Sequence, residues 1–200
     1  MLETAIQGEF DAPAERPAAR LSAADERLLT GLVAGDERSQ RIFFDRFQGL
    51  VRAHLHRVLR NPSDVDDALQ VVFTRAFAGI EGFKGQSSLS TWLYRITANT
   101  ARNVIRSRAR QERLSRAFRW VNLGRRDRLV ESPVDERDDV SRLLDALRPK
   151  LREVFVLYHH EGLNLREIAE VIDRPLSTVG DRLGRARKQL RALVFDRGGI

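Results

Sequence analysis

Residues 83–108 read FKGQSSLSTWLYRITANTARNVIRSR, in which a loop of small residues leads into a stretch with helical periodicity. Its buried-type side chains recur at spacings of three and four residues, at Leu93, Ile96, Thr100 and Val104. This spacing predicts a helix with one buried face. The opposite face collects an aromatic ring, an amide and guanidinium groups, from Trp92, Arg95, Asn99, Arg102, Arg106 and Arg110. Guanidinium groups bind phosphates and aromatic rings stack on unpaired bases, so we expect this face to bind single-stranded nucleic acid.

The residues that precede this loop predict three more helices. Ser22 is placed to cap the first helix, with Asp25 three residues later. The second helix has one apolar face, made of Phe43, Phe47, Leu50, Val51, Leu55, Val58 and Leu59. Asn61 and Pro62 end it, and Ser63 is expected to cap a third helix. The core face of that third helix consists of Val65, Ala68, Leu69, Val72, Phe73, Ala76 and Phe77.

Residues 163–190, LNLREIAEVIDRPLSTVGDRLGRARKQL, predict a helix-turn-helix. Asn164 caps the first helix with Glu167 three residues later, Pro175 interrupts the pattern, and Ser177 is expected to cap the second helix. Asp173 falls at the turn, where a left-handed backbone is required, and Asp adopts that conformation more readily than most residues other than Gly. Small Ala169 and apolar Val179 stand where the two helices of such a motif cross.

The second helix of this motif is expected to turn Val179, Leu183, Ala186 and Leu190 inward. The side chains that face outward, where a major groove would meet them, are Thr178, Asp181, Arg182 and Arg185, flanked by Arg174, Arg187, Lys188 and Arg191. Arg pairs bidentately with guanine, and a good base contact is worth about 1–3 kcal/mol of discrimination. A helical hairpin that binds protein is the competing interpretation of the same pattern.

The whole pattern predicts an all-α fold of two small helical domains joined by a flexible linker. The first domain is expected over residues 21–110, the linker over 111–139 and the second domain over 140–195. The second domain opens on an amphipathic segment with Leu143, Leu144, Leu147, Leu151, Val154, Phe155 and Tyr158. Residues 1–20 show no helical period and are expected to be a disordered leader.

The charge of the chain is unevenly distributed. The formal net charge is +7, whereas residues 102–128 alone contain ten Arg against Glu112 and Asp127. This asymmetry favours a polyanionic partner, and the aromatic and polar neighbours favour nucleic acid over an anionic membrane. The chain contains no Cys, which excludes disulfides and thiolate metal sites. No apolar run approaches the roughly 20 residues that span a bilayer, so we expect a cytoplasmic protein without membrane insertion.

The two domains, in this order, resemble the extracytoplasmic-function group of sigma-70 initiation factors. The resemblance covers about residues 22–195 and is most specific over 64–77 (DVDDALQVVFTRAF), 83–99 and 161–191. It implies a sigma factor that binds core RNA polymerase, directs it to particular promoters and helps to melt them. Such a factor is not an enzyme and needs neither a cofactor nor a metal.

By this resemblance, residues 64–77 dock on the clamp helices of the polymerase β′ subunit. The face opposite the predicted core carries little charge for a solvent-exposed surface, at Asp67, Gln70, Val71, Thr74 and Ala78. A stripe of this kind independently suggests a protein partner. The candidate polymerase-binding residues are Asp64, Asp67, Gln70, Val71 and Thr74.

The resemblance also implies that residues 83–99 capture the melted non-template strand of the minus-10 element, with a base flipped into the loop of residues 84–90. The candidates for minus-10 contacts are Lys84, Ser87, Ser88, Trp92, Tyr94, Arg95, Asn99, Arg102, Asn103 and Arg106. For Trp92 two interpretations stay open, because its ring either contacts a base or is partly buried where the loop meets the helix.

The second domain resembles the module that binds the minus-35 element and packs on the flap of the polymerase β subunit. The candidate DNA contacts there are Arg174, Ser177, Thr178, Asp181, Arg182, Arg185 and Arg187. The resemblance further implies an anti-sigma factor, often membrane-tethered, that holds the protein inactive.

Two other classes of function compete with this interpretation. A stand-alone helix-turn-helix regulator would use the same motif without polymerase. A metal-dependent nuclease would need a site built from His54, His56, His159 and His160 with Asp64, Asp66 and Asp67. The histidines disfavour it, because no two of them stand four residues apart on one helix face.

Overall fold

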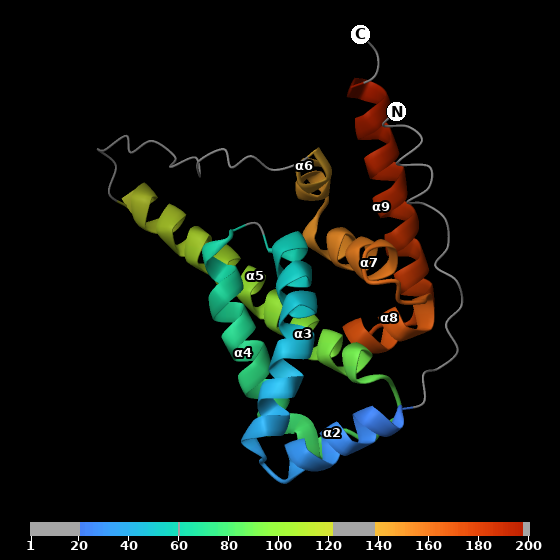
Figure 1. Cartoon of the computed structure of the whole chain (residues 1–200). Helices are drawn as coiled ribbons and strands as arrows, with labels where there is room; N and C mark the ends of the chain where they lie inside the picture. Colours follow the sequence, from blue (N-terminus) through green and yellow to red (C-terminus); the bar gives the residue numbers. More distant parts are fainter. Residues whose placement is uncertain (1–20, 60, 122–138, 198–200) are drawn as a thin grey trace.

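The computed structural model describes residues 21–59, 61–121 and 139–197, and the regular structure in these ranges is entirely helical (Figure 1). The first group of helices comprises α2 (Ala23–Val33), α3 (Glu37–Val58), α4 (Ser63–Gly79), the short 3-10 helix η1 (Ile80–Gly82) and α5 (Leu89–Val121). The second group comprises α6 (Asp139–Ala146), α7 (Pro149–His159), α8 (Leu165–Ile172) and α9 (Leu176–Arg197). The described residues therefore confirm the all-α prediction. The predicted leader lies outside them.

Helices α3, α4 and α5 pack around a cluster of Phe rings. The centroid of Phe43 lies 4.8 Å from that of Phe47 and 6.0 Å from that of Phe73, in the tilted and edge-on geometries that aromatic pairs prefer. The apolar faces predicted for α3 and α4 line this core, with Leu50 and Phe77 only partly buried at its edge. The periodicity of the sequence thus identified the core of the first group correctly.

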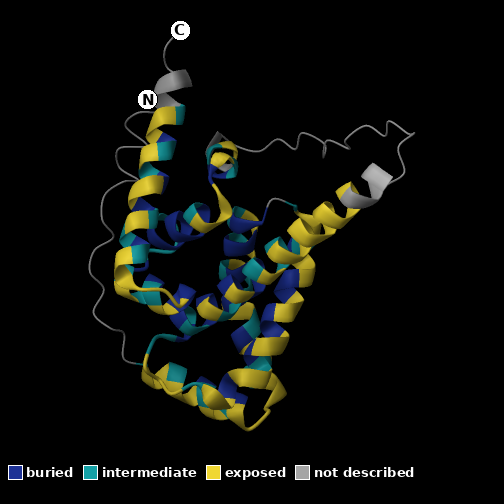
Figure 2. Cartoon of the chain, turned by 180° about the vertical axis from the view of Figure 1, so that it is seen from behind, coloured by how far each residue is buried: buried dark blue, intermediate teal, exposed yellow. Residues whose placement is uncertain are grey.

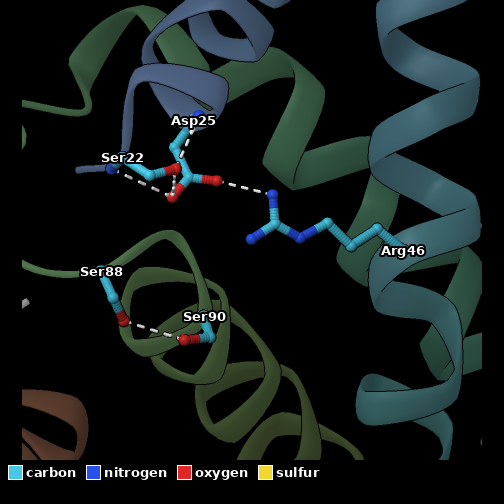
Figure 3. A network of polar contacts seen from close by, with 5 residues as sticks. All are labelled: Ser22, Asp25, Arg46, Ser88 and Ser90. Atoms are coloured by element: carbon cyan, nitrogen blue, oxygen red, sulfur yellow. Dashed lines mark hydrogen bonds and ion pairs between the residues drawn. The ribbon is translucent and has the colours of Figure 1, made fainter.

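The contacts at Ser22 and Asp25 hold α2 in place (Figure 3). The Ser22 hydroxyl accepts a hydrogen bond from the backbone N–H of Asp25, and the Asp25 carboxylate accepts one from the Ser22 N–H in return. This capping box was predicted from the sequence. The other oxygen of Asp25 lies 2.6 Å from Nη1 of Arg46, which joins the start of α2 to the middle of α3.

Two predicted boundaries are wrong. Ser63 is the first residue of α4 and does not cap it, because Pro62 already has helical angles (φ −58°, ψ −36°) and occupies the capping position without a side-chain bond. Helix α5 continues to Val121, although the linker was expected from residue 111. Its continuation is rich in Arg, a good helix former, and the Glu112 and Arg116 side chains lie 3.9 Å apart one turn from each other. Most of the predicted linker, residues 122–138, lies outside the described ranges.

In the second group, α7 is buried on nearly every side. From Arg152 to Tyr158 all seven residues of α7 are buried, although the sequence predicted a single apolar face. Helix α9 covers one side of α7 and α3 covers another. The extra burial therefore comes from contact between the two groups, which a pattern confined to one helix cannot reveal.

The two groups of helices pack against each other. Helix α8 lies against α5 and α7 lies against α3 (Figure 1), and buried residues continue across the junction in the view from behind (Figure 2). Within the described ranges, no helix is both long and apolar enough to cross a membrane.

Candidate nucleic-acid and polymerase interfaces

The loop before α5 is shaped by Gly85 and Ser88. Gly85 has φ +69°, in the left-handed region that Gly adopts without strain, and a Cβ there would lie 3.2 Å from Cδ1 of Leu21. Ser88 accepts a hydrogen bond from the backbone N–H of Thr91 at 3.0 Å and lies 2.8 Å from the hydroxyl of Ser90 (Figure 3). Ser88, a minus-10 candidate, thus caps α5 as well, while Lys84 is exposed and Ser87 is partly buried beside it.

Trp92 is partly buried and packs against Phe83, with 5.4 Å between the ring centroids. This position agrees with the second interpretation given for the ring, partial burial where the loop meets the helix. The ring is still not enclosed, since Trp92 lies at the edge of the core.

Four minus-10 candidates form an exposed polar row along α5: Arg95, Asn99, Asn103 and Arg106. The two amides are held by arginines one turn further on. Oδ1 of Asn103 accepts a hydrogen bond from Arg106 at 2.7 Å, and Oδ1 of Asn99 accepts one from Arg102. Guanidinium and amide groups thus alternate along this face, as the sequence predicted.

Tyr94 and Arg102 do not share this exposure. Tyr94 is buried, and its hydroxyl donates a hydrogen bond to Glu161, in the loop between α7 and α8. Nη1 of Arg102 lies 3.3 Å from Glu153 Oε1 on α7 and donates to the Ile172 carbonyl at 3.2 Å. In this arrangement, the assignment of Tyr94 to an open DNA surface is wrong, because the second helical group covers that part of α5.

Glu161 is the central acid of the junction, and sequence reasoning missed it. Its Oε1 lies 3.3 Å from Nδ1 of His54 and 3.4 Å from Nη1 of Arg57, both on α3. Burial raises the pKa of Glu161, but the hydrogen bonds and charges of His54, the Tyr94 hydroxyl and the charge of Arg57 outweigh it and hold the pKa below its usual value. The carboxylate is therefore stabilised in its ionised form by residues of the other helical group.

Glu153 is a second buried acid at the junction, with the opposite electrostatic balance. Burial raises the pKa of Glu153 above its ordinary value, and the nearby charges of Arg102, His54, Arg182 and Arg174 offset this only in part. Oε1 of Glu153 lies near Arg102 but has no hydrogen-bond donor among the described residues. An ionised carboxylate at this place is therefore unfavourable.

Replacing Glu153 with Gln is therefore expected to raise the free energy of unfolding at pH 7. Since the pKa of Glu153 is raised on folding, the acid costs no stability below its ordinary pKa of 4.5 and costs progressively more as the pH rises above it. Denaturant unfolding at pH 7 and pH 4 should show a gain at pH 7 that vanishes near pH 4. Glu170→Gln, at an exposed acid of α8, is the control. A loss of stability at pH 7 would mean that pairing with Arg102 outweighs burial.

The predicted helix-turn-helix is present as α8, a tight turn and α9. Asn164 Oδ1 accepts hydrogen bonds from the backbone N–H groups of Arg166 and Glu167, both at 3.0 Å, and the Glu167 carboxylate accepts one from the Asn164 N–H at 2.8 Å. Asp173 adopts the left-handed conformation expected of it (φ 52°, ψ 61°). Ser177 does not cap α9, because the helix already begins at Leu176.

The outward and inward faces of α9 are largely as predicted. Val179, Leu183, Ala186 and Leu190 are buried. Arg174, Ser177, Asp181 and Arg185 are exposed, while Thr178 and Arg182 are half-buried. Arg185 donates a hydrogen bond to Asp181 at 3.0 Å, so part of its charge is balanced within the helix. Arg187 is turned towards α7, over the ring of Tyr158 at 5.1 Å and 3.3 Å from Nε2 of His159, which removes it from the outward face.

The low-charge stripe on α4 is exposed, as predicted. Asp67, Gln70, Val71, Thr74 and Ala78 all face solvent, and Val71 exposes 39% of its surface. Asp64 differs from the other polymerase candidates, because its carboxylate is paired with Arg108 of α5 at 2.7 Å. It therefore braces α4 against α5 within the same helical group.

The histidines do not gather into a metal site. His54 is fully buried at the junction, and the ring of His159 packs on Phe155 with 4.4 Å between centroids. In the ranges that the structure describes, no three His, Asp or Glu side chains stand close enough to hold a metal ion.

Comparisons with known proteins agree with the helical division. The family model for sigma-70 region 2 matches residues 43–111, and that for sigma-70 region 4 matches residues 137–190. The ECF RNA polymerase sigma-E factor of Haemophilus influenzae is 32% identical over 177 residues, covering 83% of this chain and 93% of the relative. The Escherichia coli K12 factor of the same name is 31% identical over 176 residues, with 83% and 92% covered.

Solved structures show the same fold. CnrH in complex with the cytosolic domain of CnrY matches with a TM-score of 0.63 and 26% identity, over 86% of this chain and 98% of that one. The sigma factor RpoE in complex with the anti-sigma factor NepR, from Bartonella quintana, matches with a TM-score of 0.61 and 20% identity, over 77% and 95%. The second likeness bears on the fold alone.

Proposed function

Because the chain belongs to the extracytoplasmic-function group of sigma-70 factors, we propose that it binds core RNA polymerase, directs it to a class of promoters and helps to open the DNA there. The proposal is carried by three separate exposed surfaces on one chain. Helix α4 offers the low-charge stripe, α5 the row of amides and guanidinium groups, and α9 the outward face of a helix-turn-helix. None of these surfaces needs bond chemistry, so the chain acts by positioning the polymerase.

The polymerase contact falls to the stripe on α4. Its exposed aliphatic side chain at Val71, next to the uncharged Gln70 and Thr74, suits burial against a protein better than lasting exposure to water. Asp67 supplies one carboxylate for a polar contact at the edge. Co-elution of the chain with core polymerase in gel filtration tests the assignment, and separate elution at micromolar concentrations would refute it.

The DNA contacts divide between the two helical groups. The polar row on α5 (Arg95, Asn99, Asn103 and Arg106), with Lys84, Ser87 and the edge of the Trp92 ring, would hold the melted minus-10 strand through charge, hydrogen bonds and stacking. On α9, Thr178 and Arg182 would read the minus-35 duplex, with Arg174, Ser177, Asp181 and Arg185 near the phosphates and groove edges.

Arg182→Ala is expected to weaken the promoter complex by about 1–3 kcal/mol, the usual value of a bidentate contact to a base, and to leave core binding unchanged. Filter binding of the holoenzyme to promoter DNA would measure this. Lys188→Ala is the matched control, since Lys188 is an exposed cation of the same helix placed to touch only phosphate. Equal losses from the two variants would contradict the base-reading role of Arg182.

A protein inhibitor is a further part of the proposal. Both solved neighbours were captured with a second protein, CnrY or the anti-sigma factor NepR. An anti-sigma factor of this chain would act where polymerase and DNA are, in the cytoplasm. The stand-alone regulator is the weaker candidate, because it gives the low-charge stripe of α4 no role. It would bind duplex DNA tightly and with strong salt dependence in the absence of polymerase.

A further inference from the structure

The second helical group occupies the part of α5 that the proposed function assigns to promoter DNA. Glu161 accepts a hydrogen bond from Tyr94, Glu153 pairs with Arg102 at 3.3 Å, and the carbonyl that ends α8 at Ile172 accepts from Arg102 at 3.2 Å. On the other side of the junction, Nη1 of Arg152 donates to the Val58 carbonyl at 3.3 Å. Charged groups of each helical group are thus neutralised by the other.

We propose that the acidic face of α7 and α8, built on Glu153 and Glu161, is a docking surface for the chain's own α3 and α5, and that the docked form is a closed state unable to initiate transcription. Its occupant is fixed by charge complementarity, because the two buried acids meet His54, Arg57 and Arg102. The inference rests on the proposed function, since it takes α5 as the minus-10 surface.

The distance between promoter elements argues that the closed state cannot engage both. Elements centred at minus 10 and minus 35 are about 25 base pairs apart, or about 85 Å at 3.4 Å per pair. In the closed state, Arg102 touches the residue before the turn of the helix-turn-helix. The 17 residues between α5 and α6 can span up to about 60 Å when extended, so the chain is long enough for the groups to separate. Reading both elements therefore requires the junction to open.

The junction is built to be separable. Its contacts are dominated by a few polar side chains, and the Phe core of the first group does not cross it. Glu161 carries most of the pairing, with three donors from two helices. Removing its charge should release the docked form without touching the core of either group. Core polymerase, which needs an extended sigma factor to reach both elements, would bind the open form and draw the equilibrium towards it.

The experiment uses the full chain and takes advantage of its lack of native Cys. Dyes are attached at Arg41→Cys on α3 and Lys188→Cys on α9, both exposed, and single-molecule energy transfer reports separation of the groups. The free wild-type chain should show one high-transfer population. Glu161→Gln should shift the ratio of closed to open molecules at least tenfold towards open, and Arg57→Gln should do the same from the other side. Glu170→Gln, the same change at an exposed acid of α8, should shift nothing.

A second readout separates opening from damage. Because core polymerase binds the open form, Glu161→Gln should bind core more tightly than the wild-type chain, by up to the factor by which closed molecules outnumber open ones. A misfolded variant would bind core less tightly. The double variant Glu161→Gln, Arg57→Gln should open no further than either single variant, since both act through one contact.

Low transfer in the free wild-type chain, or unchanged transfer in Glu161→Gln, would overturn the closed state. Neither result depends on whether the chain initiates transcription. If the chain were closed when free but inactive with core polymerase on every promoter, the proposed function would fail and the docking surface would stand.

Discussion

A chain that carries Gln70→Glu and Val71→Arg is expected to bind core RNA polymerase about 100-fold more weakly than the wild-type chain, the loss typical of disrupting the centre of an interface. The two exchanges place opposite charges on the low-charge stripe of α4, where Val71 exposes 39% of its surface. Each new charge would have to lose its water on docking without a matching partner. Fluorescence anisotropy of a labelled chain titrated with core polymerase measures the affinity.

The control for this variant is Ile42→Arg. Ile42 lies on α3 and exposes 48% of its surface, so it presents the same chemical change at a comparable aliphatic side chain away from the stripe. We expect it to bind core like the wild-type chain. A double variant that also kept wild-type affinity would contradict the placing of the polymerase contact on α4.

Arg152→Ala is expected to lower the free energy of unfolding of the second helical group by about 3–5 kcal/mol, as the loss of a fully buried charged partner usually does. Arg152 is 1% exposed and donates to the carbonyls of Leu144 at 2.7 Å and of Asp145 and Leu147, both at 3.2 Å. These carbonyls end α6 and turn the chain into α7, and without the guanidinium they would stay buried and unpaired.

Thermal unfolding followed by circular dichroism measures this effect. Lys150→Ala, at an exposed position two residues earlier in α7, should change the midpoint little. Arg152→Lys should recover only part of the loss, because an ammonium group cannot donate to the same fan of carbonyls. A wild-type midpoint for Arg152→Ala would show that the turn between α6 and α7 does not depend on this side chain.

Much of the fold was predictable because its determinants are local. The core faces of α3 and α4 follow from apolar spacing, and the capping boxes at Ser22 and Asn164 follow from residues three apart. Asp173 was expected to adopt a left-handed conformation because the motif places a tight turn there, and it does. The exposure of the α4 stripe follows from the same periodicity that buries Val65 and Val72.

The junction between the helical groups was not predictable in the same way. Glu161 and Tyr94 are 67 positions apart in the sequence, and nothing local marks a glutamate in a loop as an acid that a distant hydroxyl and a histidine will bury. Arg152 had the appearance of an ordinary helix-surface cation. The full burial of α7 in the structure is the signal, since a helix buried from Arg152 to Tyr158 must bury two charged residues and find partners for them.

Transcription in vitro by bacterial core polymerase, with and without this chain, on DNA spanning the region upstream of its own gene and a panel of further promoters, tests the central claim most directly. The account predicts a start site that appears only when the chain is added and is lost in the Gln70→Glu, Val71→Arg variant. A chain that neither binds core nor yields any start site, while binding duplex DNA tightly by itself, would contradict it.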